Sequence, residues 1–170
     1  IVTSTPTIEA RFKKVNPLSL AICNYPILSE NEFIPNWSER LDEVCYVGGI
    51  SEIRGIKEII RVLGKSESYR LNLAGAFSPI NLREDIIKEK GWSFVNEYGV
   101  VNRTQIINIL NKSKIGLVTL HPRDNYLDSL PIKMFEYMYA GIPVIASDFP
   151  LWKKIIQDND CGKCVDPFNL

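Results

Sequence analysis

Two carboxylates, Asp128 and Glu136, flank the start of a segment that has the pattern of a helix. Pro131 suits the first turn of that helix and Gly141 suits the position just after its end. Free N–H groups at a helix N-terminus bind anions, and carboxylates accept hydrogen bonds from sugar hydroxyls. The segment therefore predicts a site for a ligand that carries both phosphate and hydroxyl groups.

Lys133 lies three residues before Glu136, and helical spacing places both on neighbouring faces. One interpretation is an intrahelical ion pair on the surface. The functional alternative places Lys133 near a phosphate and Glu136 on ribose hydroxyls. The apolar face expected to lie against a sheet contains Ile132, Phe135, Met138 and Tyr139.

A second candidate is the glycine loop that follows the strand-like residues 43–49. Gly48 and Gly49 would let the backbone approach a ligand closely. Arg54, at the start of the next helical pattern, offers a forked donor for phosphate. The alternative for Arg54 is a solvated surface charge.

His121 and the Cys161–Cys164 pair are weaker candidates. A lone histidine is more often satisfied by backbone or water than by a ligand. A zinc site would need further histidines or a second C-x-x-C pair, and the sequence has one histidine and four cysteines. The sequence predicts no metal site.

The composition limits the function classes. A chain of 170 residues with zero formal net charge is the size of one domain and does not resemble a basic nucleic-acid binder. No apolar run approaches the ~18 residues of a membrane span. Scattered cysteines favour a reducing cytoplasm. The first residue is not Met, so we expect a piece of a longer protein.

Strand-like and helix-like segments alternate from residue 43 onward, which predicts a Rossmann-like, doubly wound parallel α/β sheet. Ligands bind such sheets at the loops after the strands, here residues 48–54, 75–79, 98–103 and 121–131.

We expect residues 1–40 to be a lead-in, with one strand near 18–23 and a loop over 24–38, and 41–170 to be the domain. The expected strands span 43–49, 70–75, 92–95, 114–120 and 143–147, and the expected helices 54–64, 79–90, 103–112, 131–140 and 150–157.

The aspartate-x7-glutamate spacing, followed by YMYAGIPVIASD, resembles the E-x7-E segment of retaining, family 4 (group 1) glycosyltransferases of the GT-B fold. Further similar stretches occur in the family's order: YVGGISEIRGI, LNLAG, EYGVVNRTQIINILNKSKIGLVTL and CGKCVDPFN. The likeness covers roughly residues 43–169. It implies the C-terminal, nucleotide-sugar-binding half of a two-domain enzyme.

The resemblance also implies roles for individual residues. Glu136 would hold the ribose, Asp128 the donor sugar, and Val101 the base. The diphosphate would meet the backbone at Leu130, Pro131 and Ile132, with help from Gly48, Gly49, Arg54 and Lys133. Asp128 and Arg54 would act in catalysis by stabilising the charge that develops as the diphosphate leaves.

Three positions depart from the family pattern: Gly49 where an arginine is common, Arg54 where a lysine is expected, and Asp128 in place of glutamate. A nucleotide-binding module without catalysis is therefore one alternative, and a sugar-nucleotide epimerase of the same fold is another. The likeness implies no metal cofactor, and a saccharide or lipid-linked acceptor held by an absent N-terminal domain. This piece alone would be inactive. Polysaccharide biosynthesis in the cytoplasm, with peripheral membrane association of the full-length enzyme, fits the family.

Overall fold

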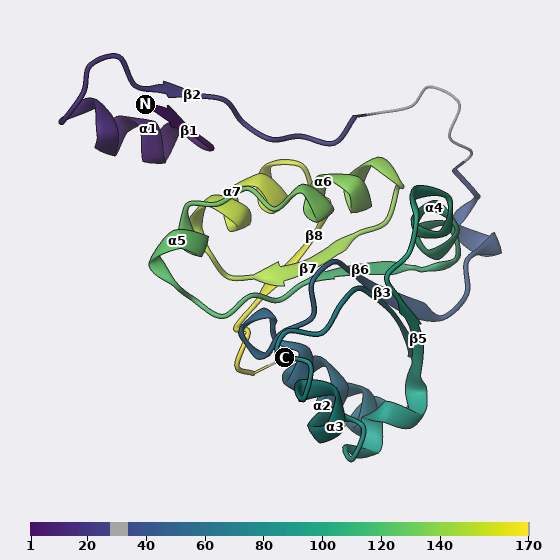
Figure 1. The fold of residues 1–170 in the computed structure, drawn as a ribbon. Coiled ribbons are helices and arrows are strands. Elements are labelled where there is room, and N and C mark those ends of the chain that lie inside the picture. Colours follow the sequence, from purple (N-terminus) through teal and green to yellow (C-terminus); the bar gives the residue numbers. More distant parts are fainter. Residues whose placement is uncertain (28–33, 170) are drawn as a thin grey trace.

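A parallel sheet forms the centre of the molecule. The computed structural model describes residues 1–27 and 34–169, and within them six strands form one sheet in the order β5-β4-β3-β6-β7-β8 (Figure 1). Every neighbouring pair in this sheet is parallel. The prediction of a doubly wound parallel α/β fold is confirmed. The strands are β3 (Glu43–Val47), β4 (Arg70–Ala74), β5 (Val95–Gly99), β6 (Ile115–Val118), β7 (Val144–Ser147) and β8 (Gly162–Val165).

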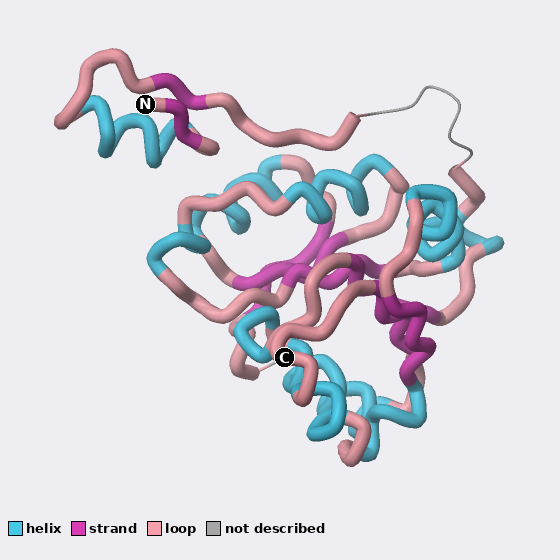
Figure 2. The backbone as a smooth tube through the Cα atoms, in the orientation of Figure 1, coloured by secondary structure: helices cyan, strands magenta, loops and turns pink. Residues whose placement is uncertain are grey.

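Helices cover both faces of the sheet (Figures 1 and 2). One face packs against α4 (Arg103–Lys112), α6 (Ile132–Tyr139) and α7 (Pro150–Asp158). The opposite face packs against α2 (Ile56–Ser66) and α3 (Leu82–Ile86). Among the described residues, none of the helices is both long and apolar enough to cross a membrane.

The region between β4 and β5 differs from the sequence prediction. Instead of a helix over 79–90 and a strand over 92–95, the chain forms the short α3, the 3-10 helix η3 (Lys90–Phe94) and then β5. Gly91 of η3 packs closely on α2: a Cβ on it would lie 1.7 Å from the Ile60 carbonyl oxygen. This backbone contact between Gly91 and α2 falls directly before the predicted strand, and β5 starts only after it, at Val95.

The N-terminal residues form a small unit of β1 (Val2–Thr3), α1 (Pro6–Lys13) and β2 (Leu20–Ala21), in which the two strands pair in parallel. A strand near 18–23 was expected, whereas α1 was not, although Thr5 caps its N-terminus by accepting from the Ile8 N–H. In Figure 1 this unit lies beyond α6 and α7, away from the sheet. Part of the loop expected over 24–38, residues 28–33, lies outside the described residues; the rest includes η1 (Trp37–Glu39).

Arg40 joins the lead-in to the rest of the chain. Its buried guanidinium donates to the carbonyl oxygens of Leu110 at 2.7 Å, Ser113 at 2.9 Å and Ala140 at 2.5 Å. These carbonyls lie at the C-terminal ends of α4 and α6, where helices leave acceptors unpaired. Arg40 thus fixes the far end of α6, the helix that carries Lys133 and Glu136. The expected boundary between residues 40 and 41 stays a prediction.

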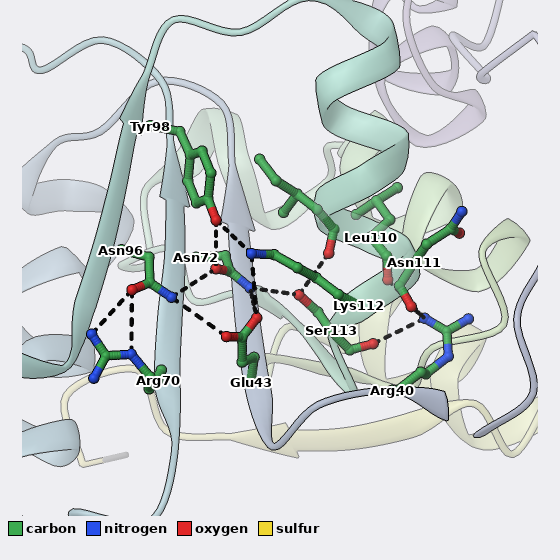
Figure 3. Close-up of polar contacts among 11 residues, drawn as sticks. Arg40, Glu43, Arg70, Asn72, Asn96, Tyr98, Leu110, Asn111, Lys112 and Ser113 are labelled. Atoms are coloured by element: carbon green, nitrogen blue, oxygen red, sulfur yellow. Dashed lines mark hydrogen bonds and ion pairs between the residues drawn. The ribbon is translucent and has the colours of Figure 1, made fainter. Parts of the chain in front are cut away.

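A buried polar network lies next to the Arg40 contacts and shares Ser113 with them, near the starts of the strands (Figure 3). Asn72, fully buried in β4, donates to Glu43 Oε2 at 2.7 Å and to Ser113 Oγ at 3.1 Å. Its Oδ1 accepts from Asn96 at 3.1 Å and from the Tyr98 hydroxyl at 3.3 Å. One side chain thereby links three strands to the end of α4.

Replacing Asn72 with leucine should therefore destabilise the fold, by about 2–4 kcal/mol, because Glu43 would keep a buried carboxylate that has lost a donor. Urea unfolding at pH 7 measures this change. The matched control is Lys154→Ala, which removes an exposed ion pair on α7 and should change the free energy of unfolding by less than ~0.5 kcal/mol. Equal effects of the two substitutions would show that the network contributes nothing.

Candidate functional site

A cavity of about 310 Å³ opens at the carboxyl ends of β3, β4 and β5. It lies beside the point between β3 and β6 where the strand order reverses, which is where open α/β sheets bind ligands. Its position agrees with the loops selected from the sequence. The residues that line it are Val47, Gly48, Gly49, Ala74, Gly75, Ala76, Val100, Val101 and Ile106.

Two glycine loops form the floor of this cavity. Gly48 has φ +124° and Gly75 has φ +147°, conformations that residues with a side chain rarely adopt. A Cβ on Gly75 would lie 1.8 Å from the Gly48 carbonyl oxygen, so the two loops touch backbone to backbone. The Gly48 N–H donates to the Ala74 carbonyl at 2.9 Å, which holds them together. A ligand here would meet glycine backbone together with valine, alanine and isoleucine residues.

The Arg54 side chain fills the position that a side chain at residue 49 would take. Arg54 is the last residue of the 3-10 helix η2 (Glu52–Arg54), and its Nη1 donates to the Gly49 carbonyl at 2.9 Å. The same carbonyl accepts from the Tyr46 hydroxyl at 2.7 Å. A Cβ on Gly49 would lie 2.1 Å from Arg54 Nη1. The glycine at position 49 and the arginine at 54 are therefore a matched pair, since the guanidinium fills the place of a side chain at 49.

The side-chain amine of Lys133 lies next to Gly48. The buried Nζ has no hydrogen-bond partner among the described residues and lies 3.8 Å from the centre of the Tyr46 ring. Burial, reinforced by the positive charge of Arg54, lowers the pKa of Lys133 to about 7. Glu136 pairs with Arg103 of α4, so the alternative of an intrahelical ion pair between Lys133 and Glu136 is not what the structure shows.

Both carboxylates of the aspartate-x7-glutamate segment face arginines. Glu136 Oε1 accepts from Arg103 Nη1 of α4 at 2.6 Å, and the Glu136 side chain is 19% exposed. Asp128, the residue that ends α5 (Asp124–Leu127), pairs with Arg11 of α1. Neither arginine was expected from the sequence as a partner of these acids.

The start of α6 lies one residue later than predicted. Pro131 is the N-cap, and the helix begins at Ile132. Proline offers no side-chain acceptor, so the first-turn N–H groups receive no side-chain cap. The Ser129 carbonyl is held instead by the Trp152 indole N–H at 2.7 Å, which anchors the loop before the helix.

The buried face of α6 also differs from the prediction. Met134 and Tyr137 are fully buried against the sheet, whereas the face containing Ile132, Phe135, Met138 and Tyr139 is only partly buried. Tyr137 is placed by two features of the sheet. Its ring fills the space above Gly116, where a Cβ would lie 2.2 Å away, and its hydroxyl accepts from the Val47 N–H at 3.0 Å.

His121 and the cysteines lie apart from this arrangement. His121 Nε2 is 3.3 Å from Glu58 Oε2 of α2, and its ring stacks at 4.5 Å from Phe168. Cys161 and Cys164 are free thiols. Within residues 1–27 and 34–169, no group of three or more histidine, cysteine or acidic side chains could hold a metal ion.

The structure thus brings together Gly48, Gly49, Arg54 and Lys133, and it places Val101 on the cavity wall. Asp128 pairs with Arg11 of α1. Sequence reasoning missed Tyr46 and Arg103. The one signal for Tyr46 was an aromatic residue two positions before the glycine pair, and Arg103 could be seen only as a charge at the start of a helix.

A family model described as glycosyl transferases group 1 matches residues 29–170. Among curated proteins, the search found no match to this chain.

Three solved structures that share the fold are 15–18% identical to this chain. S. aureus TarM, in complex with fondaparinux, α-GlcNAc-glycerol and UDP, gives a TM-score of 0.74 at 18% identity, covering 97% of this chain and 33% of its own. Anabaena Alr3699/HepE with UDP and glucose gives 0.73 at 15%, covering 98% and 49%. WaaG, involved in lipopolysaccharide biosynthesis, gives 0.68 at 17%, covering 97% and 48%. The chain spans less than half the length of these proteins.

Proposed function

The chain belongs to the group 1 glycosyltransferases, and from this membership we propose that it binds a nucleotide-diphosphate sugar for retaining transfer to a saccharide or lipid-linked acceptor. The single observation that carries the proposal is the buried Lys133 amine, which lacks an acceptor and lies under Gly48 at the start of α6. A bound anion would give this buried amine the acceptor that it lacks. The uncapped helix start and Arg54 add positive potential at the same place.

A nucleoside diphosphate fits this arrangement piece by piece. The cavity walled by Val101 and the glycine loops would take the base, and its lining of glycine, alanine, valine and isoleucine offers no polar side chain to select one base. Glu136 would accept hydrogen bonds from the ribose in place of the Arg103 guanidinium. The diphosphate would lie over Gly48, near Lys133 and the first turn of α6. The solved relatives with UDP support this assignment.

Catalysis would stabilise the charge that moves onto the leaving diphosphate. Arg54, Lys133 and the N–H groups near Leu130, Pro131 and Ile132 would offset that charge while the sugar carbon gains oxocarbenium character. Asp128 would hold the sugar hydroxyls, which requires release from Arg11. We propose that these cationic groups and N–H donors make a metal unnecessary.

The share of its relatives' length that this chain spans indicates where the acceptor would bind. Because it spans less than half of their length, we propose that the acceptor binds mainly to residues outside this chain, and that this piece binds donor without turnover. The full-length enzyme would work in the cytoplasm, where its free cysteines stay reduced. Contact with a membrane surface would then bring it to a lipid-linked acceptor.

Replacing Glu136 with alanine tests the ribose assignment. Losing a charged acceptor should weaken nucleotide binding by about 10- to 100-fold, because hydrogen bonds to charged groups contribute about 1.5–3 kcal/mol. Titration calorimetry with UDP, GDP and ADP measures the change. Glu84→Ala, an exposed acid on α3, is the matched control and should leave affinity unaltered. Unchanged affinity in Glu136→Ala would refute the ribose role.

A further inference from the structure

The protein alone stabilises the protonated form of Lys133 poorly. Its Nζ is buried, and the described residues offer it no oxygen acceptor. The face of the Tyr46 ring, 3.8 Å away, favours the ammonium form. Burial and the Arg54 charge oppose it more strongly, and they lower the pKa of Lys133 from its usual value to about 7. Near pH 8 the amine is therefore mostly neutral.

The groups that face Lys133 keep their charge state between about pH 7 and 9. From β3, burial raises the pKa of the Cys45 thiol to about 12 and also raises the pKa of the Tyr46 hydroxyl, so both stay neutral. Arg54 of η2 stays positive. Glu136, on α6 itself, pulls the pKa of Lys133 upward but is engaged by Arg103. Lys133 is thus the group whose protonation changes in this window.

Other ionisable side chains of the neighbourhood act on Tyr46 rather than on the amine. Tyr126 of α5 interacts with the Tyr46 hydroxyl, and burial raises the pKa of Tyr137 on α6. Burial therefore keeps the Tyr137 hydroxyl neutral in this window.

Gly48 is the residue that separates this amine from the cavity. Gly48 lines the cavity, and a Cβ on it would lie 3.2 Å from Lys133 Nζ, so the amine packs directly against the wall of the cavity. Because residue 48 has no side chain, only glycine backbone stands between a ligand in the cavity and the amine. An anionic oxygen that displaces this loop slightly would supply the acceptor that the protein lacks. It would also offset the Arg54 charge.

We propose that the diphosphate of the donor loads a proton onto Lys133, so that the ammonium holding the nucleotide is created when the nucleotide binds. The proton comes from solvent: the amine lone pair forms a new N–H bond, which donates to a phosphate oxygen. This inference rests on the proposed function and deepens it, because it makes affinity for the donor depend on pH at one residue.

The sign of that dependence follows from linkage. Below pH 7 the free chain already carries the proton, so binding takes up none and affinity is highest. Above pH 7 the free chain must acquire the proton on binding, so affinity falls by up to about tenfold per pH unit. Affinity continues to fall with rising pH until the pH reaches the pKa that Lys133 has in the complex with phosphate.

Titration calorimetry at pH 8.0 in HEPES and in Tris, two buffers with different ionisation enthalpies, counts the protons taken up. The probes are UDP, GDP and ADP, whose phosphates are already ionised because their last pKa is near 6. We expect ~0.9 proton per nucleotide bound, the neutral fraction of an amine with a pKa of about 7. Lys133→Arg, which is always charged, should bind without uptake, whatever its affinity. Lys153→Arg, at an exposed ion pair on α7, should keep the uptake.

The possible results separate this inference from the proposed function. Binding without proton uptake in the unaltered chain would overturn the inference and leave the function standing. Uptake that persists in Lys133→Arg would assign the proton to another group and also overturn it. A folded chain that binds none of the three nucleotides would overturn the proposed function, and the inference with it.

Discussion

The chain with methionine in place of Lys133 is expected to be more stable than the unaltered chain and to bind nucleotide more weakly. Methionine has a similar length and no charge, so it removes a buried amine that has no acceptor. At pH 7 we expect a gain of about 1–3 kcal/mol in the free energy of unfolding. Binding should weaken by about 10- to 100-fold, because the phosphate loses a charged donor.

The gain in stability should depend on pH. An unfolded lysine holds its proton up to about pH 10.4, whereas folded Lys133 releases it near pH 7. Between these values the unfolded chain binds more protons, so the stability of the unaltered chain rises with pH. The advantage of Lys133→Met should therefore shrink from pH 7 to pH 10 in urea unfolding. A variant that is less stable at pH 7, or one that binds as tightly as before, would contradict the role given to this amine.

Replacing Gly75 with alanine is expected to damage both the fold and the site. The new Cβ would lie 1.8 Å from the Gly48 carbonyl oxygen, and the backbone there has φ +147°. The loops after β3 and β4 must separate to admit it. We expect a loss of about 3 kcal/mol or more in stability, from strain plus overpacking, and a loss of nucleotide binding of at least about tenfold.

Gly99→Ala is the matched control for this prediction. Gly99 also has a positive φ of +65°, but a Cβ there would meet nothing within 4 Å. Only the backbone strain remains, worth about 1 kcal/mol. Urea unfolding and calorimetry on both variants separate strain from contact. Equal losses in the two variants would show that the contact between the glycine loops does not shape the site.

The elements with strong periodicity could be predicted from the sequence. The isoleucines of α2 recur at helical spacing, and Ile56, Ile59 and Ile60 are buried as expected. The same approach failed for α6, because apolar residues surround that helix and leave its rotation undetermined. Tertiary features set the rotation instead: Gly116 leaves space for the Tyr137 ring, and Val47 supplies a partner for its hydroxyl.

The site could be located from the sequence, but its pairings could not. Glycines after a strand and a proline before a helix mark backbone geometry, which is local, so the two loops were placed at the correct edge of the sheet. Helical spacing allowed an ion pair between Lys133 and Glu136 as the alternative to ligand contacts, because spacing along one helix ignores the other elements. In the fold, Lys133 lies under Gly48 and Glu136 meets Arg103 of α4. Such partners depend on how the elements pack and carry no local signal.

Titration calorimetry of this chain with UDP, GDP and ADP, in buffer containing EDTA, tests the central claim most directly. The account predicts saturable binding of at least one of the three, at one site per chain and without added metal. It also predicts that this binding is weakened in Glu136→Ala. A chain that is folded by circular dichroism and gives no binding to any of the three nucleotides would contradict the claim.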